Sequence, residues 1–272
     1  MDEAIFCILG RMGQHNNVVV CLRVPLDATE VFNCLTKVFP SIRLNLIVGF
    51  ANGVPHPTDI RPGDVVVGTK VMQRDGHAVY PSRSFDIAIS ALKRKHELGP
   101  SRIPSIMMEK LGKYPNFGRP ESPAATKLYL VQRRERESHD PEIHYGVITL
   151  ADQVMRDTLR DYIAKDLGPI CLQTGSAPPP HCRLIRGVSD YADSHQGEAW
   201  KRCAVATAAA YARELLEELP SQYPLPNRAQ FLDELRYEQI FGDMKSEAVT
   251  SNHTNGFFIT QSTRLGLIPN SW

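Results

Sequence analysis

Asp190 is the residue of this sequence best placed to give a proton to a ligand. It follows a short apolar run, residues 182–188, which is typical of a buried strand apart from its arginines. Ligands of open α/β sheets bind beyond the carboxyl ends of the strands, so an acid here would face a binding site and could act as a general acid. The alternative is that Asp190 or Asp193 only caps a turn or a helix, as aspartate often does.

Metal-binding and Walker-type phosphate-binding motifs do not occur in the sequence. His181 and Cys182 are adjacent, but no further ligands follow at a useful spacing, so we expect no metal site. The cysteines form no CxxC pair, and their scattered places in apolar segments predict buried, reduced thiols. They are Cys7, Cys21, Cys34, Cys171, Cys182 and Cys203.

The segments that must position Asp190 alternate between strand and helix patterns. Strands are predicted at residues 4–9, 17–22, 44–49, 64–69, 143–150, 170–172 and 182–188. Helices are predicted at residues 27–39, 83–99, 104–114, 154–167 and 200–219. Residues 49–55, rich in glycine and asparagine, are predicted to form a turn. This alternation indicates an α/β domain.

Composition along the chain predicts one domain and a tail. With 272 residues, 42% of them hydrophobic, the chain can bury one large core, which we place in residues 1–220. Residues 115–140 are rich in proline and charge and are predicted to be a mobile excursion. Residues 221–272 are predicted to be a linker and C-terminal tail, in which an amphipathic segment at 231–241 packs on a neighbour or stays loose.

The charge balance disfavours nucleic acid and anionic membranes as partners. The formal net charge is +1 and the pI is about 7.7, so there is no basic excess to attract either. The N-terminus lacks a signal-peptide pattern, and no apolar run reaches the roughly 20 residues of a membrane span. A cytoplasmic location is the expectation.

Several motifs keep a family-like order and spacing between residues 6 and 219. They are residues 39–43 (FPSIR), 48–55 (VGFANGVP), 59–67 (DIRPGDVVV), 144–148 (HYGVI), 152–155 (DQVM) and 185–195 (IRGVSDYADSH). On these motifs the chain resembles the nucleoside phosphorylase and nucleosidase superfamily, of the purine and uridine phosphorylase type. The nearest form is the fungal one that is often fused to NACHT or ankyrin receptor proteins. The resemblance implies a three-layer α/β fold, a twisted mixed sheet flanked by helices, with a nucleoside pocket over the strand ends.

The resemblance also implies roles for residues around the base. Asp190 would protonate or hydrogen-bond N7 of a purine while the glycosidic bond breaks, which makes the base a better leaving group. Ser189 would orient Asp190, although a satisfied strand-end hydroxyl explains a serine here equally well. Gln153, Val154 and Met155 would line the base pocket, although an apolar helix start would have the same residues.

A phosphate- or water-binding loop is implied by the same resemblance. It would comprise Gly49, Phe50, Asn52 and Gly53, where glycines let backbone amides approach an anion. Phe50 and Asn52 interrupt the usual small, glycine-rich pattern, so a plain turn is the alternative. No cofactor is expected, with inorganic phosphate as the co-substrate if the enzyme is a phosphorylase. A homo-oligomer is expected because members of the superfamily assemble.

Three departures from the superfamily weaken the case for catalysis. The first strand and its loop are missing, which exposes a sheet edge unless a partner chain, the C-terminal tail or a second copy covers it. Thr174 and Gly175 stand where relatives have a Met-Glu pair whose carboxylate holds the ribose hydroxyls. The helix that follows that pair is replaced by three prolines, residues 178–180.

Three functions therefore remain open from the sequence. The first is purine nucleoside phosphorylase or nucleosidase chemistry, at full or impaired activity, with Asp190 as the general acid. The second is a non-catalytic module that senses a nucleoside-like ligand or mediates assembly in a receptor-like system. The third is a pocket adapted to another small molecule of a specialised biosynthetic pathway.

Overall fold

The fold was analysed in a computed structural model. It describes residues 7–22, 28–55, 57–73, 77–81, 83–120, 136, 138–151, 168–174, 178–179, 182–191, 199–220 and 256–262. The strands are β1 (Cys7–Met12), β2 (His15–Leu22), β3 (Ile42–Gly53), β4 (Val65–Met72), β5 (Ala78–Val79), β6 (Ile143–Ala151), β7 (Cys171–Thr174), β8 (Cys182–Asp190) and β9 (Gly256–Ser262). The helices are α1 (Ala28–Val38), α2 (Asp86–Leu98), α3 (Ile103–Leu111) and α5 (Ala199–Glu218), with short 3-10 helices η1 (Arg83–Phe85) and η2 (Pro115–Phe117).

A mixed sheet organises the molecule, and part of it closes into a barrel. Strand β3 pairs with β8, β8 with β4, β4 with β6, β6 with β7, and β7 returns to β3. The β3–β8, β4–β6 and β6–β7 pairs are parallel, whereas β4–β8 and β3–β7 are antiparallel. The predicted α/β class, a mixed sheet flanked by helices, is confirmed, and the closure into a barrel adds to it.

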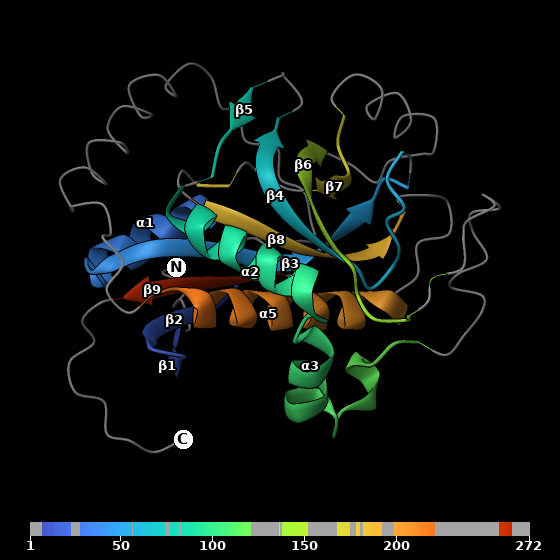
Figure 1. Cartoon of the computed structure of the whole chain (residues 1–272). Helices are drawn as coiled ribbons and strands as arrows, with labels where there is room; N and C mark the ends of the chain where they lie inside the picture. Colours follow the sequence, from blue (N-terminus) through green and yellow to red (C-terminus); the bar gives the residue numbers. More distant parts are fainter. Residues whose placement is uncertain are drawn as a thin grey trace.

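Helices cover both faces of the sheet, which gives the expected layers. The alanine-rich helix α5 runs along one face, with α2 and α3 beside it (Figure 1). Its residues share a hydrophobic cluster with Leu44, Leu46 and Val48 of β3. On the other face α1 packs its buried side chains with Ile47 and Ala51 of the same strand. Alternating residues of β3 therefore enter two cores, as expected for a strand that is buried on both sides.

The segment β9 lies inside the sheet. It runs antiparallel to β2, from Asn16 opposite Ser262 to Leu22 opposite Gly256. It is also antiparallel to β3, as far as Gly49 opposite Gly256, with an irregularity near Ile42. Figure 1 shows it between the ribbons of β2 and β3. The exposed sheet edge that the sequence led us to expect is thus covered by residues 256–262 of this chain.

Two predictions of local structure were wrong. Residues 49–53 are the end of strand β3 rather than a turn, because β8 and β7 pair with them. The thiols of Cys21 and Cys34 are exposed, since Cys21 alternates with the buried Val18 and Val20 of β2 and Cys34 lies on the outer side of α1. The thiols of Cys171, Cys182 and Cys203 are buried as predicted, and Cys7 is half-buried.

Several predicted segments lie outside the described residues. These are the helix at 154–167, the amphipathic segment at 231–241 and most of the excursion, from 121 to 135. The other predicted helices and strands are present with bounds shifted by a few residues. None of the described helices has the length and apolar character needed to cross a bilayer.

Candidate functional site

Strand β8 delivers Asp190 to one end of the barrel. Side chains alternate along a strand, so Arg186 and Val188 share a face, and Val188 is buried among the core residues on the α1 side of the sheet. The pairing with β3 then slips by one residue at Ser189, so Asp190 lies opposite Asn52 of β3. The Asp190 residue is half-buried at the last position of the strand. A carboxylate at such a position is partly shielded from water and still open to a ligand.

Two neighbours hold the Asp190 carboxylate by hydrogen bonds. Ser189 Oγ donates to Asp190 Oδ2 at 3.0 Å and lies 3.4 Å from the carbonyl oxygen of Ala51. The Asn52 amide, in the orientation that satisfies its own nitrogen and oxygen, donates to Oδ1 at 2.8 Å and to Oδ2 at 3.3 Å. Ser189 and Asn52 thereby fix the rotamer of Asp190. The hydrogen bond between Ser189 and Asp190 supports the predicted role of Ser189 in orienting Asp190, and this role stays a prediction.

A bulge at the end of β8, at Ser189, brings Asp190 opposite Asn52 of β3. The parallel register between β3 and β8 shifts between Ala51 and Asn52, so that Asn52 pairs with Asp190. Bulges of this kind re-aim side chains and are common beside functional sites. Gly53 follows in a tight place, since a Cβ there would lie 2.9 Å from Val188 Cγ1. The glycine is therefore needed for strand packing, whether or not its amide binds an anion.

Phe50, one of the residues predicted to bind phosphate or water, contacts a cation of helix α5. Its ring lies 5.5 Å from the Nζ atom of Lys201, a residue of α5. An ammonium group at this distance from a ring is held by a cation–π attraction. The four residues predicted to bind phosphate or water, including Gly49, thus lie along one strand end. Their role in anion binding stays a prediction.

The remaining predicted residues are only partly described. Thr174 ends β7 and is half-buried, with Ala151 of β6 as its pairing partner. Gln153, Val154, Met155 and Gly175 lie outside the described residues. The structure therefore brings Asn52, which was predicted to belong to the phosphate- or water-binding loop, next to Ser189 and Asp190.

Arg186 is a buried charge that the sequence analysis did not interpret. Its side chain is 4% exposed, donates from Nε to Gln173 Oε1 at 2.6 Å, and donates from Nη1 to the Ile47 carbonyl at 3.2 Å. Burial lowers the pKa of Arg186 to about 10, so the group stays protonated at neutral pH. Among the described residues, no carboxylate forms an ion pair with it. An arginine inside an otherwise apolar strand was the signal that could have revealed it.

Asp64 organises a second polar cluster at the start of β4. Its carboxylate accepts hydrogen bonds from Arg136 at 2.7 and 2.8 Å, from His144 Nε2 at 3.0 Å, and from the backbone amides of Arg61 at 2.8 Å and Glu142 at 3.1 Å. Burial would raise the pKa of Asp64, but the bonds from His144 and Arg136 outweigh it and lower that pKa. A carboxylate with so many donors has no capacity left for a ligand, so this cluster is structural.

No group of three or more histidine, cysteine or acidic side chains is placed to hold a metal ion within the described residues. The expected absence of a metal and of a cofactor stays a prediction.

Comparison with known proteins finds a relative described as an NLR-like protein. No protein-family model matches the chain. A nucleotide-binding leucine-rich repeat (NLR)-like protein of the fungus Hyaloscypha variabilis is 29% identical over 268 residues, which cover 84% of this chain. The chain spans only 27% of the length of that relative.

Comparison of structures identifies the fold. The S-adenosylhomocysteine nucleosidase of Streptococcus pyogenes, in complex with 5-methylthiotubericidin, has a TM-score of 0.51 and 15% identity, covering 79% of this chain and 84% of that one. The methylthioadenosine/S-adenosylhomocysteine nucleosidase of Neisseria meningitidis has a TM-score of 0.47 and 16% identity, covering 78% and 90%. The likeness to the streptococcal enzyme shows that the chain shares the fold of a nucleosidase.

Proposed function

We propose that the chain cleaves the N-glycosidic bond of a purine nucleoside, with Asp190 as the group that holds a proton at N7 of the leaving base. The observation that carries this proposal is the fixed carboxylate of Asp190 at the barrel end, held by Ser189 and Asn52. A fixed carboxylate loses little conformational entropy when a ligand binds to it. The nucleosidase fold supports the same chemistry.

The proposed reaction breaks the bond between the anomeric carbon and the base nitrogen. The electron pair of that bond moves into the purine, and Asp190 passes its proton to N7, which makes the base a neutral leaving group. The sugar becomes oxocarbenium-like, and water or inorganic phosphate forms the new bond to its anomeric carbon. An attacking water then releases a proton to solvent, and Asp190 takes up a proton from solvent in place of the one that left with the base.

Because Thr174 is neutral, we expect a lower rate of base release than in an enzyme with a carboxylate at this place. Thr174 supplies a neutral hydroxyl at a place where a carboxylate would bind both ribose hydroxyls. Loss of one charged hydrogen-bond partner costs about 1.5 to 3 kcal/mol, or roughly one to two orders of magnitude in turnover. We therefore expect slow but measurable release of base.

Chromatographic detection of free base tests the proposal. Purine nucleosides are incubated with the chain, with and without phosphate, and the Asp190→Asn variant is compared with Asp140→Asn. Asp140 is an exposed aspartate outside this site. We expect Asp190→Asn to lose base release by at least about 100-fold, in line with the loss of a general acid, and Asp140→Asn to keep it. Equal rates in the two variants would exclude Asp190 from the reaction.

A non-catalytic ligand-binding module is the second candidate. It is favoured by the relative named as an NLR-like protein, of which the chain spans 27%, and by the neutral Thr174. This candidate predicts that a purine nucleoside raises the melting temperature of the folded chain without any base release. Release that depends on Asp190 would exclude it. Size-exclusion chromatography with and without nucleoside measures whether the ligand also drives assembly.

A further inference from the structure

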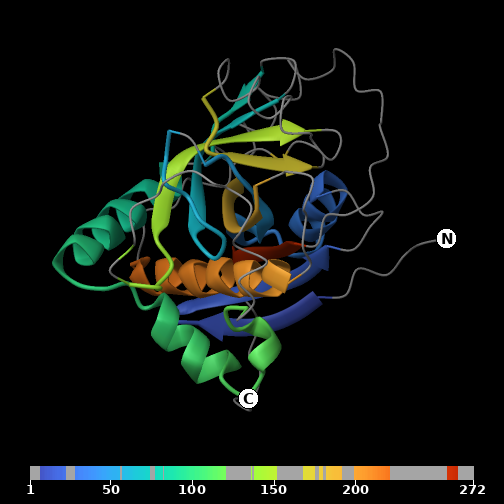
Figure 2. The ribbon, with the colours of Figure 1, turned by 90° about the vertical axis from the view of Figure 1, so that its right-hand side faces the viewer.

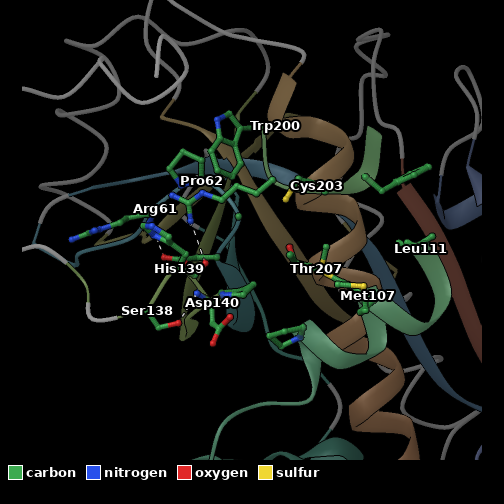
Figure 3. A pocket seen from close by; sticks show the side chains of 18 of the residues that line it. Arg61, Pro62, Met107, Leu111, Ser138, His139, Asp140, Trp200, Cys203 and Thr207 are labelled. Atoms are coloured by element: carbon green, nitrogen blue, oxygen red, sulfur yellow. Dashed lines mark hydrogen bonds between the residues drawn. The ribbon is translucent and has the colours of Figure 1, made fainter. Parts of the chain in front are cut away.

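A pocket lies between α5, α3 and the turn that precedes β4. It has a volume of about 430 Å³, within the range of small-molecule sites. Figure 3 shows the side chains that line it, with Trp200 at one end and Met107 and Leu111 toward α3. Neither Asp190 nor any other described residue of the predicted nucleoside site lines this pocket. It is therefore a separate cavity.

The walls next to the helices are apolar. Trp200 and Cys203 of α5 are each 4% exposed, and Met107 and Leu111 of α3 are half-buried. Burial raises the pKa of the Cys203 thiol to about 11, so this thiol is neutral and behaves as an apolar group. Thr207, which also lines the pocket, donates a hydrogen bond from its hydroxyl to the Ala204 carbonyl oxygen at 2.9 Å. These walls suit a ring or an aliphatic group.

Two of the arginines at the pocket already have acidic partners. Arg61 pairs with Asp59 at 2.7 Å, and Arg136 pairs with Asp64 at 2.7 Å. Their positive charges are therefore compensated within the protein.

Arg119 is the cation that stays available to a ligand. Its guanidinium lies 5.4 Å from the centre of the Trp200 ring and donates from Nη1 to the His139 carbonyl at 3.2 Å. These contacts fix its position, and no carboxylate of the described residues forms an ion pair with it. Asp140, an acid that also lines the pocket, lies apart from Trp200 in Figure 3. The Trp200 end of the pocket thus has an uncompensated positive charge beside an apolar wall.

We propose that this pocket binds a small apolar molecule with one negative charge, of the class of aromatic carboxylates and sulfonates. The anionic group pairs with Arg119, and the apolar body lies between Trp200 and the side chains of α3. A charge-assisted contact to Arg119 adds to the burial of the apolar body. The site is independent of the nucleoside chemistry proposed above.

Tryptophan fluorescence gives a local test with a defined probe. The sequence has two tryptophans, and Trp272→Phe leaves Trp200 as the sole reporter. This chain is titrated with anilinonaphthalene sulfonate as the anionic probe and with N-phenylnaphthylamine as its neutral counterpart. Arg119→Gln is compared with Arg202→Gln, which removes an exposed arginine of α5 that does not line the pocket. Near-ultraviolet circular dichroism checks that each variant is folded, since partly folded chains also bind the anionic probe.

The expected result is saturable quenching of Trp200 by the sulfonate, with affinity reduced roughly 10-fold or more in Arg119→Gln and unchanged in Arg202→Gln. The neutral probe binds more weakly than the sulfonate, and adenosine displaces neither. The proposal is overturned if Trp200 is not quenched, if the two variants bind alike, or if the neutral probe binds as well as the sulfonate. Displacement by adenosine would instead assign this pocket to the nucleoside.

Discussion

At the scale of single residues, Asp64 is a buried carboxylate whose ionisation contributes to stability. Its pKa is lowered in the folded protein, so it contributes stability above its ordinary pKa of 3.8, and this contribution is lost as the pH falls through the lowered value. We expect Asp64→Asn to lower the free energy of unfolding at neutral pH by about 3 kcal/mol, because Arg136 loses its one buried ionic partner among the described residues and keeps only the half-exposed carboxylates of Glu142 and Asp59. The difference in free energy of unfolding between wild type and Asp64→Asn should become smaller below pH 3.8.

Urea denaturation from pH 3 to pH 7 measures this difference. Asp59→Asn is the matched control, since Asp59 is a half-exposed partner of Arg61 and a surface pair contributes at most about 1 kcal/mol. A difference between wild type and Asp64→Asn that stays constant over the whole range would contradict the assignment.

At the scale of elements, the contact between α5 and β8 depends on Gly187. A Cβ at this position would lie 1.7 Å from the Ala204 carbonyl oxygen and 2.7 Å from the Ala204 Cα. Helix and strand must separate to admit it, and overpacking of this kind costs about 3 kcal/mol or more. We expect Gly187→Ala to unfold at a clearly lower temperature, as measured by circular dichroism.

Gly10→Ala is the control for this substitution. Gly10 lies in β1, and nothing is within 4 Å of the Cβ that alanine would add there. Its melting temperature should stay close to that of the wild type. If Gly187→Ala had the same melting temperature as Gly10→Ala, helix α5 would not be in close contact with strand β8.

The local sequence pattern was sufficient to predict most helices and strands. It was insufficient where pairing between strands that are remote in sequence determines the structure. Strand β8 and helix α5 follow from the apolar run and the alanine-rich face. The end of β3 was predicted to be a turn because glycine and asparagine favour turns, yet its pairing with β8 and β7 outweighs that preference. Strand β9 was not predicted, although its run of phenylalanine, isoleucine and threonine favours a strand. Its place in the sheet could not be predicted, because its partners, β2 and β3, are remote in sequence.

The candidate site was predictable to a similar extent. Asp190 could be found from its place at a strand end. Asn52 could be assigned to the neighbourhood by resemblance, but its bond to Asp190 depends on a bulge that no local pattern shows. Arg186 was overlooked because its partners Gln173 and Ile47 come from two other strands.

At the scale of the whole molecule, β9 completes the hydrogen bonding of two strands. Without it, β2 and β3 would each present an unpaired edge, which is a template for association with other chains. We expect a chain that ends at residue 255 to aggregate or to form dimers, whereas one that ends at residue 262 stays in the state of the parent chain. Size-exclusion chromatography with light scattering distinguishes them. Identical elution of the two truncated chains would contradict the role of β9.

The place of β9 also sets the order in which the molecule can be completed during synthesis. Strands β2 and β3 are made early, but the strand that lies between them is made only when residues 256–262 leave the ribosome. A nascent chain with α1, the barrel and α5 already formed must keep a gap in its sheet until then, with unpaired backbone exposed to solvent. The last step in folding this sheet thus waits for residues 256–262, and chaperones that bind extended segments can act in that interval.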